Sequence, residues 1–322
     1  MSTTDSQIHT RIRELACRKN AVILAHNYQR GEIQDVAHHV GDSLGLSRLA
    51  ADTDADIIVF CGVYFMAETA KLLSPDKKVL IPDPQAGCPM ANMITGRELE
   101  EAKREHPDAI VVCYVNSTAE VKAHSDVCVT SGNALDVCRE LPRDKPVLFV
   151  PDAHLGRWVA ERIGRDDFIL WEGFCPTHQR ILPEEIRRLK REHPEAEVLV
   201  HPECPKEAVD EATLVTSTSG ILKRARESDA TEFIIGTECG ILHRLAKENP
   251  GKTFYRAGLF SDCPNMKLVT LEKLLWSLED EVYEVEVEPK VAAKARKALE
   301  SMVGAPSVRG GSAPAGPPGG VG

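Results

Sequence analysis

The chain has 322 residues, of which 43% are hydrophobic, 27% charged and 5% aromatic, a composition typical of a globular protein. This length suggests about two or three domains. The net charge of −10 and the absence of any run of five or more Lys or Arg residues argue against a protein that binds nucleic acid or a membrane surface.

Residues 1–18 are predicted to form an N-terminal helix ahead of the first domain. They lack the apolar core of a signal peptide, and no stretch of the chain approaches 18 consecutive apolar residues. Ten cysteines without a secretion signal suggest the reducing cytosol, where clustered thiols more often bind metal or catalyse reactions than form disulfides. We therefore expect a cytoplasmic protein.

Short runs of β-branched apolar residues alternate with helix-period segments along the chain. The first run of each group lies at 21–25, 110–115 and 197–200. The runs that follow them are 56–61 and 78–82; 126–130, 146–150 and 168–171; and 213–216, 232–236 and 253–257. Alternation of this kind predicts the α/β class, with parallel sheets covered by helices.

A period of about 88 residues relates these groups. Cys88, Cys175 and Cys263 each precede a proline and stand 87 and 88 residues apart. Three further triplets keep nearly the same spacing: His26, Tyr114 and His201; Tyr28, Asn116 and Glu203; and Ser43, Ser131 and Ser219. Chance alignment of short polar residues is a poor explanation for four triplets in phase.

The period has the size of a small α/β domain. We predict three homologous domains, 19–106, 107–193 and 194–286, around a pseudo-threefold axis. Residues 287–303 are predicted to form a C-terminal helix, because they have helical spacing and an early proline. Residues 304–322 are rich in Gly, Pro, Ser and Ala, which predicts a disordered tail.

Equivalent loops of three such domains would bring the three in-phase cysteines together on the axis. Convergent thiolates suit either zinc or an iron–sulfur cluster. A [4Fe–4S] cluster with three protein ligands would leave one iron open to act as a Lewis acid. The other cysteines share no spacing and are expected to be ordinary buried thiols.

The polar triplets follow the first strand of each domain, where α/β proteins bind ligands. Residues two apart point to one side, so His26 with Tyr28, Tyr114 with Asn116, and His201 with Glu203 are expected to face one cavity. Such a set suits general acid–base chemistry. Ser43, Ser131 and the run 216–219 begin predicted helices, where they could cap the helix, bind anionic groups, or do both. Three anion sites around one cavity imply a small acidic substrate.

Taken together, these residues resemble the quinolinate synthase family. Twelve strings in order carry the resemblance over residues 10–303: AHNYQ (25–29), GDSLGLSR (41–48), VYFMAETAKLL (63–73), PDPQAGCPMA (82–91), YVNSTAEVKA (114–123), VTSGNA (129–134), VPDAHLG (150–156), WEGFCPTH (171–178), HPEC (201–204), STSGI (217–221), GTECGI (236–241) and CPNMK (263–267). Some members carry a C-x-x-C-x-x-C run at the third cysteine, whereas Cys263 stands alone here, so a regulatory disulfide is not expected there.

The resemblance implies three pseudo-symmetric α/β domains around a [4Fe–4S] cluster. It implies a transferase of NAD biosynthesis that condenses iminoaspartate with dihydroxyacetone phosphate to give quinolinate, phosphate and two waters. An aspartate oxidase or dehydrogenase would supply the iminoaspartate. The order of the condensation steps stays open, as does the choice between a monomer and a homodimer.

Carried over by position, the resemblance also implies residue roles. The cluster ligands would be Cys88, Cys175 and Cys263. Substrate carboxylate or phosphate oxygens would be held by His26, Ser43, Ser131, His201, Ser217 and Thr218. The reacting carbons would be surrounded by Tyr28, Tyr114, Asn116 and Glu203, with Glu203 as general base and Tyr28 as proton donor. Lys71, His178 and Lys267 belong to the same strings without a clear division between substrate contact and support.

Two other classes remain as alternatives. The first is a different triplicated metalloenzyme, either a zinc lyase or a diphthamide-type radical enzyme. Metal analysis separates zinc from iron, and the diphthamide enzymes lack the HNYQ and HPE strings at these places. The second is a non-catalytic repeat module that binds a metabolite, which would leave the titratable strand-end residues without a purpose.

Overall fold

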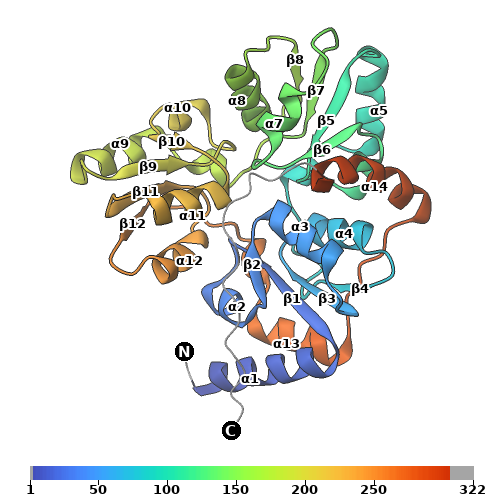
Figure 1. The fold of residues 1–322 in the computed structure, drawn as a ribbon, viewed down its shortest axis with the longest axis vertical. Helices are drawn as coiled ribbons and strands as arrows, with labels where there is room; N and C mark the ends of the chain where they lie inside the picture. Colours follow the sequence, from blue (N-terminus) through green and yellow to red (C-terminus); the bar gives the residue numbers. More distant parts are fainter. Residues whose placement is uncertain (1–2, 305–322) are drawn as a thin grey trace.

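The computed structural model describes residues 3–304, so the predicted disordered tail lies, apart from its first residue, outside the described residues. Three separate four-stranded sheets, all parallel, stand around a common centre (Figure 1). This arrangement confirms the α/β class and agrees with three repeated α/β units. None of the helices in the described part is long and apolar enough to cross a membrane.

Each sheet uses its four strands in the same order, with the first strand second from the edge. The first sheet runs β2 (His39–Gly41), β1 (Ala21–His26), β3 (Ile57–Cys61), β4 (Lys78–Leu80). The second runs β6 (Val127–Val129), β5 (Ile110–Tyr114), β7 (Val147–Val150), β8 (Phe168–Leu170). The third runs β10 (Leu214–Val215), β9 (Glu197–Val200), β11 (Glu232–Gly236), β12 (Thr253–Arg256). One topology used three times is the structural form of the sequence period.

Strand β2 was not predicted from the sequence. Its residues, His39–Gly41, are few and partly polar, so they give no apolar run. The backbone nevertheless pairs in parallel with β1, with His26 opposite Gly41. The strand begins 88 residues before β6, and β6 begins 87 residues before β10, so the period itself places a strand there.

The helices other than α1 and α14 also follow the period. The first group is α1 (Thr3–Arg18), α2 (Gly31–Val36), α3 (Ser43–Asp52), α4 (Tyr64–Leu73) and α5 (Gly96–Glu105). The second is α6 (Ala119–Ala123), α7 (Ala134–Arg139), α8 (Ala153–Ile163) and α9 (Pro183–Glu192). The third is α10 (Lys206–Val209), α11 (Thr218–Glu227), α12 (Ile241–Glu248), α13 (Leu271–Asp280) and α14 (Pro289–Gly304). Short 3₁₀ helices, η1 (Met90–Asn92), η2 (His178–Arg180) and η3 (Met266–Leu268), follow the three in-phase cysteines.

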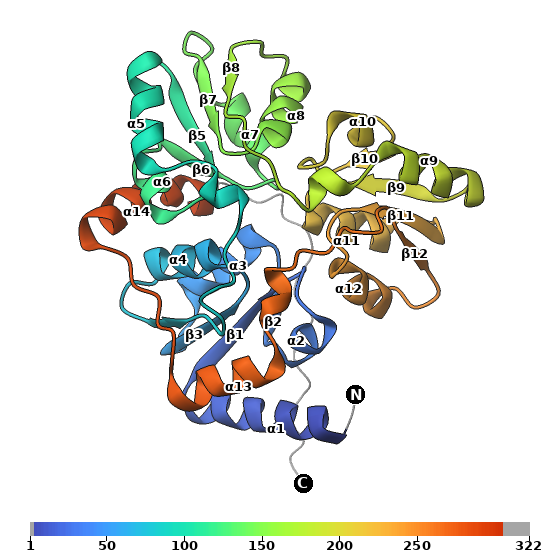
Figure 2. The ribbon, with the colours of Figure 1, turned by 180° about the vertical axis from the view of Figure 1, so that it is seen from behind.

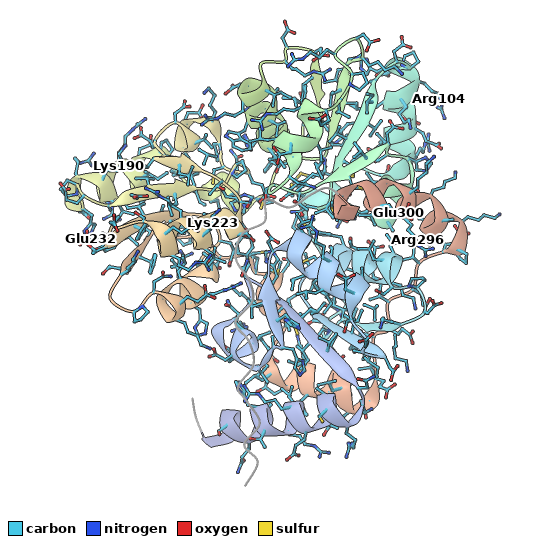
Figure 3. All side chains as sticks on the ribbon, in the orientation of Figure 1. Arg104, Lys190, Lys223, Glu232, Arg296 and Glu300 are labelled. Atoms are coloured by element: carbon cyan, nitrogen blue, oxygen red, sulfur yellow. The ribbon has the colours of Figure 1, made fainter. Side chains whose placement is uncertain are left out.

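The helix after each 3₁₀ turn packs on the next unit rather than on its own. Helix α5 contacts α6, α9 contacts β11, and α13 contacts α1 and β3, so the third unit reaches back to the first (Figure 2). The strands themselves form the core, with every residue of β1 and β3 buried. Labelled charged side chains such as Arg104 and Lys190 lie on the outer surface (Figure 3). This ring of contacts holds the carboxyl ends of the strands around the centre.

Helix α14 joins the first and second units, because it packs on α4, α6 and β6. Its Leu299 is fully buried in the largest core cluster. We expect Leu299→Ala to lower the free energy of unfolding by about 2–5 kcal/mol, through lost apolar contact and the cavity left behind. Urea denaturation checks this. The exposed Lys297 on the same helix gives the control: Lys297→Ala should stay within about 0.5 kcal/mol. Equal stability of both variants would mean that α14 does not stabilise the core.

Candidate active site

A central cavity lies where the carboxyl ends of the three sheets meet. About 680 Å³ of space there, including open solvent at its mouth, is not filled by protein atoms. Its lining comes from all three units and includes three cysteines, three histidines, two tyrosines and two glutamates: Cys88, Cys175, Cys263, His26, His178, His201, Tyr28, Tyr114, Glu203 and Glu238. A cavity lined in this way by residues far apart in sequence is the place to look for chemistry.

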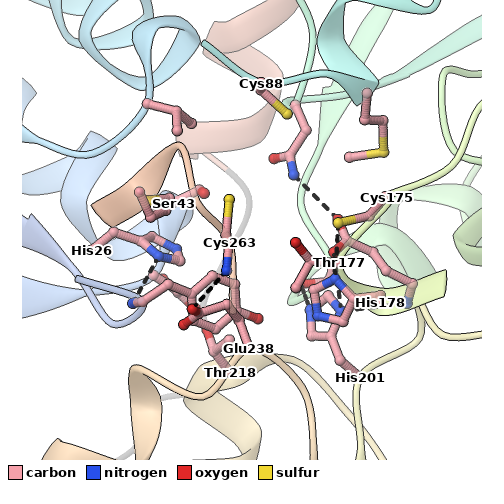
Figure 4. Close-up of a pocket in the computed structure, with 18 of the residues that line it drawn as sticks. His26, Ser43, Cys88, Cys175, Thr177, His178, His201, Thr218, Glu238 and Cys263 are labelled. Atoms are coloured by element: carbon pink, nitrogen blue, oxygen red, sulfur yellow. Dashed lines mark hydrogen bonds and ion pairs between the residues drawn. The ribbon is translucent and has the colours of Figure 1, made fainter. Parts of the chain in front are cut away.

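Three separate loops carry the cysteines into this cavity (Figure 4). The loops follow β4, β8 and β12, and each cysteine stands just before its proline and a 3₁₀ helix. All three thiols are free. Burial raises the pKa of Cys88 to about 12 and also raises those of Cys175 and Cys263, so without a bound cation the thiols stay protonated.

The polar pairs predicted at the strand ends line the same cavity. His26 ends β1, Tyr114 ends β5, and His201 follows β9 directly. Tyr28, Asn116 and Glu203 stand two residues further along and also line the cavity. In each parallel sheet the first strand is flanked by strands on both sides. Ligands of α/β proteins bind beyond the carboxyl ends of such strands, and here these ends border the central cavity.

The hydroxyl triplet needs one correction. Ser43 and Ser131 line the cavity, but Ser219 is exposed and donates to the carboxylate of Asp42 at 2.5 Å. The third hydroxyl in the cavity belongs to Thr218, which is 87 residues after Ser131 and so keeps the spacing of the other triplets. The helix surface explains the difference, because adjacent residues of α11 point in different directions.

Only one of the expected serine caps is found. Ser217 caps α11 by accepting a hydrogen bond from the Gly220 N–H at 3.3 Å, and it is not among the residues that line the cavity. Helix α3 is capped instead by Asp42, whose carboxylate accepts from the Gly45 N–H at 2.8 Å. The side chain of Ser43 is therefore not used in capping α3.

Glu203 lies at the centre of the hydrogen-bond network. Its Oε2 is 2.8 Å from Nδ1 of His178 and 3.6 Å from Nδ1 of His201. Its Oε1 accepts from the Asn116 amide at 3.2 Å, and the Tyr114 hydroxyl also hydrogen-bonds to this carboxylate. The side chain is almost completely buried. Four neighbours therefore fix this carboxylate in one orientation.

A chain of hydrogen bonds links Tyr28 to Glu203. The Tyr28 hydroxyl lies 2.6 Å from Oγ1 of Thr237, which lies 2.8 Å from Nε2 of His178. The other nitrogen of His178 faces Glu203. With Nδ1–H of His178 donating to the carboxylate, Nε2 accepts from Thr237, whose hydroxyl oxygen accepts from Tyr28. In this arrangement every donor points toward Glu203. A proton moving from Glu203 to Tyr28 uses the other tautomer of His178, in which Nε2–H donates to Thr237 and Nδ1 accepts from Glu203.

Sequence reasoning missed Thr237 and left the role of His178 undecided. Thr237 follows β11, and His178 opens η2. Neither has a polar residue at one period: the positions in phase with His178 are the apolar Ala91 and Met266. Internal symmetry therefore gave no signal for them, and only the GTECG and WEGFCPTH strings pointed there.

The two lysines of the same strings have different places. Lys267 lies beside the cavity, where its Nζ is 3.0 Å from Oε1 of Glu238 and donates to the carbonyl of Tyr28. Glu238 Oε1 also accepts from the Cys263 N–H at 3.0 Å, so this pair fixes the third cysteine loop. Lys71 contacts the carbonyl of Lys77 and is not among the lining residues.

Burial controls the charge state of the cavity. Desolvation lowers the pKa of His26 and of His201 from 6.5 to about 3, so both rings are neutral at pH 7. Burial raises the pKa of Tyr28, which keeps its proton. Burial also acts to raise the pKa of Glu203, but His178 and the hydrogen bonds outweigh it and lower the pKa to about 2. The cavity thus combines the neutral imidazoles of His26 and His201 and the protonated phenol of Tyr28 with the ionised carboxylate of Glu203.

These shifts predict how stability depends on pH. In the unfolded chain His26 and His201 become protonated as the pH falls below 6.5. In the folded chain both stay neutral down to about pH 3. The free energy of unfolding should therefore fall as the pH falls through this window, by roughly 1 kcal/mol per pH unit for each histidine. Urea denaturation of the cluster-free chain measures the slope, which His201→Gln should flatten. An unchanged slope in that variant would show that His201 is protonated in the folded state.

The donor set fits an iron–sulfur cluster. Three free thiols enter one cavity from equivalent loops, which is the ligand type such clusters require. The cavity also contains an unpaired hydrogen-bond acceptor. Oδ1 of Asn116 is buried and has no hydrogen-bond partner among the described residues. An unpaired acceptor in the same cavity as the thiols indicates that the cavity binds a ligand that pairs with it.

The chain is similar to known proteins along most of its length. Residues 10–304 match the family described as quinolinate synthetase A protein. A quinolinate synthase of Pelobacter propionicus is 52% identical over 299 residues, 93% of this chain and 98% of the relative. One of Dehalococcoides mccartyi (strain CBDB1) is 53% identical over 296 residues, 92% and 97% of the two chains. One of Methanosarcina barkeri is 49% identical over 298 residues, again 92% and 97%.

Proposed function

The chain belongs to the quinolinate synthetase A protein family, and we propose how its central cavity carries out the reaction of that family. The chain is an enzyme of NAD biosynthesis with quinolinate synthase activity. Its substrates in the proposed reaction are iminoaspartate and dihydroxyacetone phosphate, which give quinolinate, phosphate and two waters. The observation that carries the proposal is the meeting of three in-phase cysteines and three in-phase polar pairs in one cavity.

The thiols of Cys88, Cys175 and Cys263 are proposed to hold a [4Fe–4S] cluster. When bound, such a cluster supplies one iron with an open position, which acts as a Lewis acid toward substrate oxygen and nitrogen. The protein contributes three loops fixed by neighbouring contacts. The Asn265 amide donates to the carbonyl of Gly87 at 2.7 Å, which ties the third cysteine loop to the first.

The anionic groups of the substrates are proposed to bind the hydroxyls of Ser43, Ser131 and Thr218. His26 and His201 stand beside them as neutral imidazoles that can donate one hydrogen bond each. Oγ of Ser131 lies 3.1 Å from Nε2 of His201, so the second and third units act on the same group. Ser217 is proposed to act indirectly, by fixing the start of α11 where Thr218 stands.

Glu203 is proposed as the general base and Tyr28 as the proton donor. Tyr28 gives its own proton to a leaving oxygen, and the proton that Glu203 removes from a substrate carbon replaces it through His178 and Thr237. For this transfer Nδ1 of His178 accepts from the protonated Glu203 while Nε2–H donates to Thr237, whose hydroxyl donates to Tyr28. Tyr114 and Asn116 fix the carboxylate and face the same space. One network thereby connects proton removal with the loss of water.

Thr237→Val tests this network. The change keeps the shape of the side chain but removes the hydroxyl that joins Tyr28 to His178. We expect kcat to fall by about 100-fold while KM and iron content stay near the values of the unmodified enzyme. Steady-state kinetics under argon measures both constants.

The matched control is Thr237→Ser, which keeps the hydroxyl and should retain most of the activity. If the valine variant turned over at the normal rate, protons would not pass through Thr237. If KM rose with kcat unchanged, this side chain would serve substrate binding instead.

The supply of substrate and the location of the enzyme follow from the same chemistry. Imines hydrolyse readily in water, so we propose that an aspartate-oxidising enzyme delivers iminoaspartate close to where it is used. We also propose that the protein acts in the cytoplasm, where three free thiols stay reduced.

An anaerobic assay with aspartate, an aspartate oxidase and dihydroxyacetone phosphate tests the function. Quinolinate should accumulate in proportion to the enzyme, and iron should be present. A zinc-containing protein that forms no quinolinate would favour the zinc lyase instead.

A further inference from the structure

Three side chains of metal-binding type converge at one wall of the cavity. Cys175, His178 and Glu203 each place one ligand atom within 4.8 Å of the other two. Nδ1 of His178 is 3.1 Å from the sulfur of Cys175 and 2.8 Å from Oε2 of Glu203. In the described part of the chain no other group of Cys, His, Asp or Glu side chains is this close. The three cysteines themselves do not form such a group.

The local chain geometry explains why these atoms meet. Cys175 and His178 are spaced Cys-x-x-His across the turn that opens η2, which brings both side chains to one side. Glu203 approaches from the loop after β9. The far nitrogen of His178 is held by Thr237 and the far oxygen of Glu203 by Asn116. Metal-binding histidines and carboxylates are regularly fixed by outer partners of this kind.

We propose that the chain without its cluster binds one divalent transition-metal ion at Cys175, His178 and Glu203, with Zn²⁺ as the preferred occupant. Sulfur, nitrogen and oxygen ligands bind Zn²⁺ at about 2.3, 2.0 and 2.1 Å, which places tetrahedral ligand atoms about 3.3–3.6 Å apart. The observed separations of 3.1 and 2.8 Å need to widen by roughly half an ångström. The Cys175 sulfur and the Glu203 oxygen, which lie within 4.8 Å of each other, need to stand at about 3.6 Å. The cavity leaves room for water as the fourth ligand.

This ion and the cluster exclude each other, since both need the sulfur of Cys175; this step rests on the proposed function. The ion would also occupy Glu203, the proposed base. A zinc-loaded chain is therefore an inactive form, and it has to release the ion before a cluster can assemble.

Titration of the cluster-free chain with Co²⁺ under argon tests the site. Cobalt in a tetrahedral site shows visible bands and, with thiolate ligands, a charge-transfer band whose intensity counts the sulfurs. We expect one ion per chain, a band of one-thiolate intensity and displacement of the cobalt by Zn²⁺. A band of three-thiolate intensity would overturn the proposal in the unmodified protein, whether or not any variant folds.

Variants locate the ion. His178→Gln and Glu203→Gln should each weaken Co²⁺ binding by about 100-fold or more, because losing an outer partner alone costs about 10–100-fold. Cys175→Ser should abolish the charge-transfer band. Cys88→Ser and Cys263→Ser are the matched controls and should keep one ion with an unchanged band. Loss of the ion in either control would place it among the three cysteines and contradict the proposal.

A competition experiment separates this inference from the proposed cluster. Assembly from ferrous iron and sulfide is followed by visible absorbance, with and without one equivalent of Zn²⁺ added first. The zinc-loaded chain should form the cluster more slowly, in step with zinc release. Equal rates would show that the ion does not use Cys175. Cobalt binding at the three residues in a chain that forms no cluster would refute the cluster and leave the ion site standing.

Discussion

Cys175→Ser is expected to abolish both the iron–sulfur centre and quinolinate formation. Serine has nearly the same shape as cysteine but is a much poorer ligand for iron. Only two of the three thiolates would therefore remain. We expect iron and sulfide to fall from about four of each per chain toward zero, with loss of the brown colour. Lewis-acid stabilisation amounts to several kcal/mol, so kcat should fall by about 1,000-fold or more.

Iron and sulfide analysis of protein purified without oxygen measures the first effect, and a quinolinate assay measures the second. Cys239→Ser is the matched control, because Cys239 is half-buried near the Cys263 loop but does not line the cavity. It should keep both iron and activity. A Cys175→Ser protein with a full complement of iron would show that this thiol is not a ligand.

Glu203→Gln is expected to remove turnover while leaving the cluster in place. Glutamine keeps the shape of the side chain and can still accept from the Asn116 amide. It cannot take up a proton, and it presents an amide to His178 and His201 where a carboxylate stood. A general base contributes about 100- to 10,000-fold, so kcat should fall by that factor.

The measurement is single-turnover kinetics alongside iron analysis on the same sample. Glu232→Gln serves as the control, since Glu232 lies on the outer part of the third unit, 3.3 Å from His193 (Figure 3). That variant should behave as the unmodified enzyme does. If Glu203→Gln retained kcat and raised only KM, Glu203 would bind substrate without acting as a base.

Most of the site was predictable because it obeys the threefold repeat. A residue such as Cys88 gives a weak signal alone, but its partners Cys175 and Cys263 stand at the same place in equivalent units. Symmetry then requires their loops to meet. The same argument predicts from the sequence alone that His26 and Tyr114 line the cavity, where the structure has them.

The parts that sequence reasoning missed or left undecided break the repeat or give weak local patterns. His178 and Thr237 have no polar counterparts at the same place in the other two units, so the repeat gives no signal for them. Strand β2 is too short and polar to show an apolar run. The spacing of 88 residues pairs Ser43 and Ser131 with Ser219, whereas the hydroxyl that lines the cavity is that of Thr218, which the family resemblance also implies. A single step along a helix turns a side chain by about 100°, so Ser219 points out of the cavity.

The most direct test of the central claim is Mössbauer spectroscopy of ⁵⁷Fe-labelled protein, recorded with and without quinolinate. Three thiolate ligands from Cys88, Cys175 and Cys263 leave one iron of four to meet the ligand. The account predicts that one quarter of the iron signal shifts when quinolinate is added and the rest stays. A spectrum that does not change, or one without a four-iron cluster, would contradict it.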